Sequence, residues 1–114
     1  MDKIAEDSAR AEKWNAMSLP LQMGNIGSEV SRAVKWVNKN EANSIRAAER
    51  ALDLFDLTIK SQLAANRRSA VRELCRAREV FCDFIFGENE YSSTGESLIK
   101  YYDEFVLYHR TGEG

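Results

Sequence analysis

Residues 45–63 read IRAAERALDLFDLTIKSQL, and this stretch decides the fold class of the chain. Its main apolar side chains recur at alternating spacings of three and four residues, which is the period of one face of an α-helix. They are Ile45, Ala48, Leu52, Phe55, Ile59 and Leu63. Ala47, Ala51 and Leu54 widen the apolar arc to roughly half of the helix circumference. The stretch therefore predicts a helix over residues 42–63 that packs against two neighbours.

Helical patterns continue on both sides of this stretch. Upstream, the same spacing predicts a helix over residues 20–37, which Pro20 opens and the polar run Asn38-Lys39-Asn40 ends. Downstream, a third helix follows the Ala65-Asn66 turn and stops near Gly87. Its inner stripe is expected to hold Val71, Leu74, Cys75, Phe81, Cys82 and Ile85.

The last helix has the clearest local signal in the chain. Ser93-Thr94-Gly95-Glu96 reads as a capping box. In this motif the Ser93 side chain accepts a hydrogen bond from a backbone N–H of the first turn, and the Glu96 side chain reaches back to the backbone N–H of the capping residue. Connections of about two to eight residues between the helices favour antiparallel neighbours. We therefore expect an all-α protein, a four-helix up-and-down bundle over residues 18–109. Residues 1–17 are expected to form an N-terminal helical extension, and residues 110–114 a frayed tail.

Composition and charge limit the partners of the chain. Its net charge of −2 and isoelectric point near 5.5 give no overall positive field toward nucleic acid or an anionic membrane. No apolar run is long enough to cross a bilayer, and the first residues carry acids where a leader would be apolar. We expect a cytoplasmic protein with no membrane and no specific nucleic acid partner.

The residues that usually carry catalysis or bind metal are few. Cys75 and Cys82 lie about two turns, or roughly 10 Å, apart on one helix and cannot bridge each other, so we expect two buried thiols. One histidine in the chain allows no local zinc or di-iron set. We expect no catalytic residue, no metal and no cofactor. The alternative is a metal-dependent phosphohydrolase that uses Glu49, Asp53 and Asp56.

Arg78 falls in the middle of the apolar stripe of the third helix. An arginine keeps its charge, and an unpaired buried cation costs several kcal/mol, so a buried Arg78 needs a carboxylate partner. Glu29 is the first candidate and Asp56 the second, with Asp53 one turn behind it. Such a cluster would be structural or would line a binding site for a small anion. The alternative is that Arg78 reaches the bundle surface and pairs there.

The opposite face of the same helix carries charges of both signs. Its residues are Arg68, Arg72, Arg76, Glu79 and Asp83. Residues 66–78 hold five arginines and one glutamate, a formal charge of +4 that could contact phosphates. A solvated face with pairs such as Arg72 to Glu79 is the commoner arrangement, and we expect it here.

Two features predict self-association. The segment Val80–Phe86 is apolar on nearly every side, more than one bundle interior can cover, unless residues 1–17 fold back over it. The first helix also has a seam of small residues, namely Gly24, Gly27, Ser28 and Ser31. This seam predicts close approach by another helix, within the chain or across a dimer, unless the helix kinks or starts after Gly27. We expect a homodimer, with a further protein as a second kind of partner.

Four segments of the chain resemble a family of short bacterial helical-bundle proteins. They are Met17–Val30, Glu49–Ile59, Arg76–Val80 and Tyr101–Phe105. The resemblance implies a helical bundle over about residues 17–108 and brings no assigned activity. At the level of fold the chain is also similar to HEPN-type bundles, whose nuclease members have an arginine followed by a histidine with four to six residues between them. No arginine precedes His109 at that spacing, which argues against ribonuclease activity.

The sequence therefore predicts a non-catalytic helical module for binding or interaction that self-associates. Its predicted binding residues are Arg78, Glu29, Asp56 and Asp53. The alternative is an enzyme, either a divergent HEPN-like nuclease or the metal-dependent phosphohydrolase described above.

Overall fold

The computed structural model describes residues 3–111, and within them the side chains of residues 8–107. The described part consists of five α-helices joined by turns and short loops. They are α1 (Lys3–Asn15), α2 (Leu19–Trp36), α3 (Glu41–Ala64), α4 (Arg68–Ile85) and α5 (Gly95–Thr111). The predicted all-α fold is confirmed, and the N-terminal extension adds a fifth helix. The helix expected to end at residue 109 continues to Thr111, and residues 112–114 of the predicted tail lie outside the described part.

The turns after α2 and α3 use asparagine to reverse the chain. Asn38 and Asn66 have positive φ angles of 68° and 59°, a left-handed conformation that asparagine tolerates better than most residues. Asn40 then caps α3, because its side chain accepts a hydrogen bond from the N–H of Asn43 at 3.0 Å. Both turns lie where the sequence predicts them.

The cap of α5 differs from the prediction by one residue. Thr94 directly precedes the helix, and its Oγ1 accepts from the N–H of Ser97 at 2.9 Å. The Ser97 hydroxyl accepts in return from the N–H of Thr94 at 2.9 Å. The predicted pair of Ser93 and Glu96 is therefore wrong. Ser93 instead exchanges two hydrogen bonds of 2.8 Å with the side chain of Asn89, which shapes the preceding loop.

The core forms around α2, which packs along both α3 and α5. The inner stripe of α2 is fully buried and consists of Met23, Ile26, Val30 and Ala33. Phe55 of α3 lies against aromatic rings of two other helices. Its ring centre is 6.3 Å from that of Phe81 on α4 and 6.4 Å from that of Tyr102 on α5. The core therefore joins four helices through a small number of large side chains.

Gly27 lets α5 approach α2 closely. A Cβ atom at Gly27 would lie only 2.7 Å from the Cβ of Tyr102. Near the start of α5, a Cβ at Gly95 would lie 2.6 Å from Cγ1 of Val34. The close packing predicted from the small-residue seam of α2 is therefore confirmed, and it occurs within the chain.

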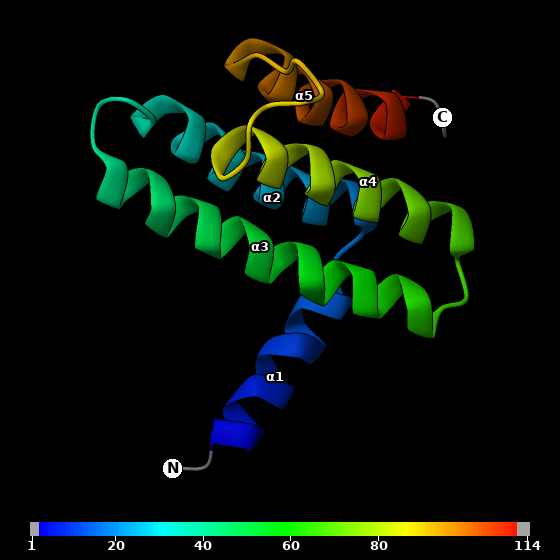
Figure 1. Cartoon of the computed structure of the whole chain (residues 1–114). Helices are drawn as coiled ribbons and strands as arrows, with labels where there is room; N and C mark the ends of the chain where they lie inside the picture. The colour runs from blue at the N-terminus through cyan, green and yellow to red at the C-terminus, as the bar shows by residue number, and fades with distance from the viewer. Residues whose placement is uncertain (1–2, 112–114) are drawn as a thin grey trace.

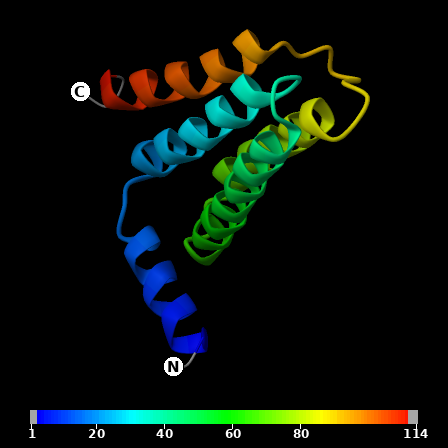
Figure 2. The same ribbon diagram turned by 90° about the vertical axis from the view of Figure 1, so that its left-hand side faces the viewer.

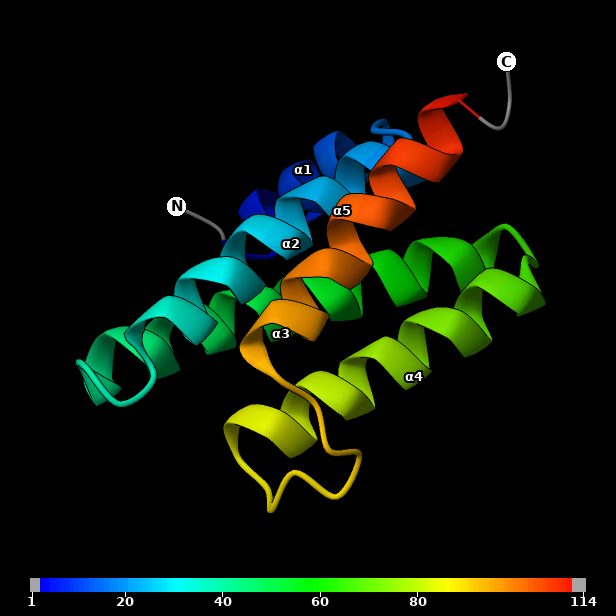
Figure 3. The ribbon, with the colours of Figure 1, turned by 90° about the horizontal axis from the view of Figure 1, so that it is seen from above.

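The bundle is open between α4 and α5. Successive helices from α2 to α5 reverse direction, as an up-and-down connection requires (Figure 3). However, α5 lies over α2 while α4 lies along α3 (Figures 1 and 2). As a result α4 and α5 approach each other far less closely than either approaches its own packing partner. The helix α4 forms an edge of the molecule (Figure 3).

The helix α1 projects from the bundle and is anchored at its C-terminal end (Figure 1). Trp14 is buried, and its indole N–H donates to Oγ1 of Thr58 on α3 at 2.9 Å. The carbonyl of Trp14 accepts from the side-chain amide of Gln22 at 2.8 Å. Because α1 packs against α3, it does not lie over the aromatic end of α4, which was the alternative covering for that segment.

We expect Gly27→Ala to lower the free energy of unfolding by about 1–3 kcal/mol, because the added methyl group overlaps Tyr102 and overpacking costs that much. Gly24→Ala is the matched control on the same helix. There the new Cβ would lie 3.7 Å from Cγ2 of Val106, which is an ordinary contact. Alanine favours a helix over glycine by about 1 kcal/mol, so Gly24→Ala should not destabilise the protein. Urea unfolding measures both, and equal stability of the two variants would contradict the close approach of α5.

Candidate functional site

Arg78 lies at the edge of the contact between α4 and α3. Its Nε donates to Oδ1 of Asp56 at 3.0 Å, and the two side chains are 36% and 55% exposed. The partnership with Asp56 is confirmed, but the predicted burial is wrong, and Glu29 is not the partner. The open bundle explains this difference. Because α4 buries only Leu74 and Phe81, the residues beside this narrow stripe stay near the surface.

The other two predicted carboxylates pair with other arginines. Glu29, with a side chain only 16% exposed, accepts from Arg50 at 3.1 Å and pairs with Arg32 at 3.2 Å. Asp53 pairs with Arg10 of α1 at 3.2 Å. The predicted cluster is therefore three separate ion-pair groups, which link neighbouring helices. Of the two alternatives for this cluster, the pair of Arg78 with Asp56 favours a structural role over an anion site.

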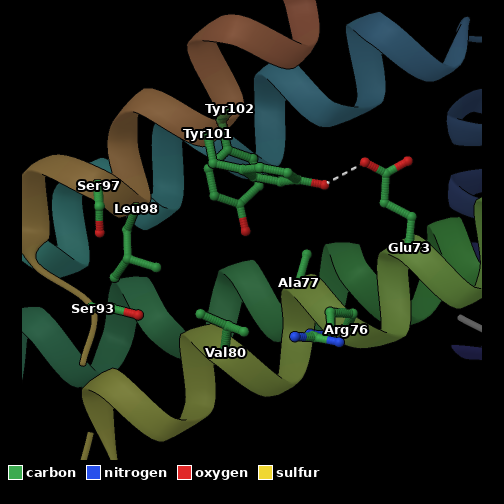
Figure 4. Close-up of a pocket in the computed structure, with 9 residues that line it drawn as sticks. All are labelled: Glu73, Arg76, Ala77, Val80, Ser93, Ser97, Leu98, Tyr101 and Tyr102. Atoms are coloured by element: carbon green, nitrogen blue, oxygen red, sulfur yellow. Dashed lines mark hydrogen bonds between the residues drawn. The ribbon is translucent and has the colours of Figure 1, made fainter. Parts of the chain in front are cut away.

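A groove of about 320 Å³ occupies the open side of the bundle between α4 and α5 (Figure 4). Its apolar walls come from Ala77, Val80, Leu98 and Tyr102. Across it, the hydroxyl of Tyr101 donates to Oε2 of Glu73 at 2.9 Å (Figure 4). Burial, together with this hydrogen bond to a carboxylate, raises the pKa of Tyr101, so the phenol stays protonated and acts as a donor. The groove is suited to apolar contact, and the hydroxyl of Ser97 in its lining is hydrogen-bonded to the backbone of Thr94.

The side of α4 that is called here the outer face carries opposite charges at its two ends. The outer face consists of Arg68, Arg72, Arg76, Glu79 and Asp83. Residues 66–78 have a formal charge of +4, from five arginines and one glutamate. Residues 79–90 have a formal charge of −4, from four acids and no base.

The arginines at the start of α4 are not neutralised within the described part of the chain. Among the described side chains, Arg67, Arg68 and Arg72 form no ion pair. The expected pair of Arg72 with Glu79 is absent there, and Glu79 accepts from the hydroxyl of Tyr91 instead. The positive end of the outer face is therefore available to an acidic partner.

The loop after α4 folds back over the acidic end of the outer face. The carboxylate of Asp83 accepts from the backbone N–H groups of Glu90 at 2.8 Å and Tyr91 at 3.1 Å. The guanidinium of Arg76 lies 5.5 Å from the centre of the Tyr91 ring, within cation–π range. Tyr91 is thus fixed where the charge changes sign, and its ring is still 42% exposed.

Exposed apolar side chains lie beyond both ends of the outer face. At the corner between α3 and α4 there is a hollow of about 390 Å³, called here the corner hollow, and its lining comprises Leu63, Asn66, Arg67, Arg68, Val71 and Arg72. Leu63 is 59% exposed, so its predicted place in a buried stripe is wrong. Residues 63–69 are all exposed, and no element of the described part of the chain covers this corner. At the other end, Phe86 is 52% exposed, but Phe81 is buried and Val80, Phe84 and Ile85 are partly buried, so the surplus apolar surface is smaller than predicted.

Sequence reasoning missed the corner hollow because it assumed that Leu63 faces a neighbouring helix. The order of charges on the outer face is visible in the sequence as arginines followed by acids along one helical stripe. Whether these charges pair with each other within the helix depends on the tertiary structure and cannot be predicted from that order. The other two aromatic residues of the segment Val80–Phe86 belong to the core, since Phe81 is fully buried and Phe84 packs partly against it.

Within the described residues, no three histidine, cysteine, aspartate or glutamate side chains come together in a group that could hold a metal ion. Asp53 and Asp56, two of the acids of the alternative metal site, are each paired with an arginine. The side chain of His109 lies outside the described residues.

The two cysteines differ from the predicted pair of buried thiols. Cys75 is exposed, because α4 packs on one side only. Cys82 is half-buried, and burial raises the pKa of its thiol. Both are free thiols.

No family model, curated protein or solved structure matches this chain. The resemblance to short bacterial helical bundles and to HEPN-type bundles therefore stays a prediction. None of the helices within residues 3–111 combines the length and apolar content that crossing a bilayer requires.

We expect Arg78→Ala to lower the free energy of unfolding by less than about 1 kcal/mol, because its pair with Asp56 is largely solvated. Breaking a buried pair would cost about 3 kcal/mol or more. Asp56→Asn removes the other partner and should have an equally small effect. Urea unfolding of both variants measures this change in the free energy of unfolding. A loss of about 3 kcal/mol for either variant, as for a buried pair, would contradict the surface position of the pair.

Proposed function

We propose that this chain is a non-catalytic helical interaction module that self-associates, and that it acts in the cytoplasm, where its two free thiols stay reduced. One observation carries the proposal. The helix α4 packs closely on α3 and only slightly on α2, and the residues that adjoin its two ends, Leu63 and Phe86, keep large apolar side chains in water.

Association would remove this apolar surface from water. Leu63, Phe86 and Tyr91 are between 42% and 59% exposed, and all three lie along α4 or at its ends. Burial of such side chains contributes about 25 cal/mol for each Å² of apolar surface. Apolar and aromatic residues that share one face of a small domain usually mark a partner surface.

The charges on α4 support a protein partner over a nucleic acid. The arginines at its start attract an acidic surface, but residues 79–90 carry four acids on and beside the same face. These acids would repel a phosphate backbone that ran along α4. A protein surface that offers both signs of charge would match both ends.

In sedimentation velocity at about 50 µM, we expect a species of twice the chain mass of 13.0 kDa. Dilution toward about 1 µM should release the monomer, since a small interface with few apolar side chains gives moderate affinity. A lone 13.0 kDa species at every concentration tested would remove the proposal.

We expect no specific binding of RNA or DNA, because the acidic end of α4 opposes the phosphates that its arginines attract. Fluorescence anisotropy with labelled single-stranded and double-stranded probes at physiological salt measures this. The control is a variant with Arg68, Arg72 and Arg76 all changed to alanine. A salt-sensitive dissociation constant below 1 µM that this control loses would show the expectation to be wrong.

A further inference from the structure

We infer that two copies of the chain join through the outer faces of their α4 helices, packed antiparallel about a twofold axis beside Cys75 and Arg76. This inference rests on the proposed self-association and specifies its surface. Two independent features of α4 agree on the same register, namely the order of its charges and the apolar groups at its ends, and Arg68, Arg72 and Arg76 are exposed on the side away from α3.

The charges on the outer face are complementary to themselves when the helices run antiparallel. Residues 68 and 83 are equally distant from the point between residues 75 and 76, and so are residues 72 and 79. An antiparallel pair with this centre sets Arg68 opposite Asp83 of the partner subunit. It likewise sets Arg72 opposite Glu79 of the partner subunit, and the twofold axis repeats both pairs. A parallel pair would set arginine against arginine.

The same register brings the apolar ends together. Residues 63–65 lie as far before the centre as residues 86–88 lie after it. Phe86 therefore reaches the corner hollow of the partner subunit, where Leu63 and Val71 provide apolar contact. The arginines that line this hollow can stack on an aromatic ring. Each copy supplies one aromatic group and one hollow, as a closed twofold dimer requires.

Apolar anchors and charges have different roles in this dimer. Exposed ion pairs add little affinity, so they mainly set the direction and register of the two helices. Phe86 in the corner hollow supplies most of the affinity, as aromatic groups in interface pockets commonly do. The two copies of Arg76 lie near the axis, and the contact of each with Tyr91, beside Glu79, offsets their mutual repulsion.

The first test exchanges one charge pair. Arg72→Glu and Glu79→Arg should each weaken the dimer about tenfold or more, because each places two like-charge pairs across the axis. An equimolar mixture of the two variants should recover dimer, now as a heterodimer, and so should the chain that carries both substitutions. Sedimentation velocity measures all four samples, and circular dichroism checks that each variant is folded.

The outcomes separate the inference from the proposed function. Weakening by both variants with recovery in the mixture supports the antiparallel register. If the unchanged chain dimerises and neither variant weakens it, the surface is wrong, although the self-association stands. If the unchanged chain is monomeric, the proposed function falls together with the inference.

The second test uses the exposed thiol beside the axis. A short bis-maleimide should join Cys75 to Cys75 of the partner subunit and give a covalent dimer on a denaturing gel. Cys82→Ser should keep the cross-link, and Cys75→Ser should abolish it. A dimer that links only through Cys82, or does not link at all, would overturn the inference. Phe86→Ala, which acts far from the thiol, should reduce the cross-linked fraction at low micromolar concentration.

Discussion

The close approach of α5 to α2 is the contact on which the arrangement of the other helices depends. At Gly27 the absent side chain lets Tyr102 lie directly on the backbone of α2, and Tyr102 is only 3% exposed there. With α5 held on α2, it cannot also cover α4. The groove between α4 and α5 and the exposed arginine end of the outer face both follow from this packing. One small residue in the most buried helix thus determines which surface is left for a partner.

The sequence predicted the helices well because their signals are local. The spacing of apolar residues marked four helices, and Asn38 and Asn66 marked the turns. The packing order could not be predicted in this way, because it depends on contacts between residues distant in the chain. Arg78 and Cys75 were placed in the core on the assumption that α4 has a helix on each side. Asp56 was among the candidate partners of Arg78 because it lies at the edge of the apolar arc of its own helix.

The outer face of α4 shows how tertiary contacts change the meaning of a sequence pattern. A row of arginines followed by acids is typical of a solvated helix whose charges pair within it. Here Glu79 binds Tyr91 and Asp83 binds the following loop, while the first arginines find no acid among the described side chains. The charge separation along α4 therefore persists in the folded chain. Together with the corner hollow and Phe86, it makes this face complementary to a second copy of itself.

The central claim is that this complementarity brings Phe86 of one copy into the corner hollow of another. An isotope-filtered NOE experiment on a mixture of labelled and unlabelled chains tests this most directly, because it detects only contacts between copies. The account predicts cross-peaks from the methyl groups of Leu63 in one copy to the aromatic ring of Phe86 in the other. Cross-peaks that connect only other surfaces, such as α1 or the groove at Leu98, would contradict it.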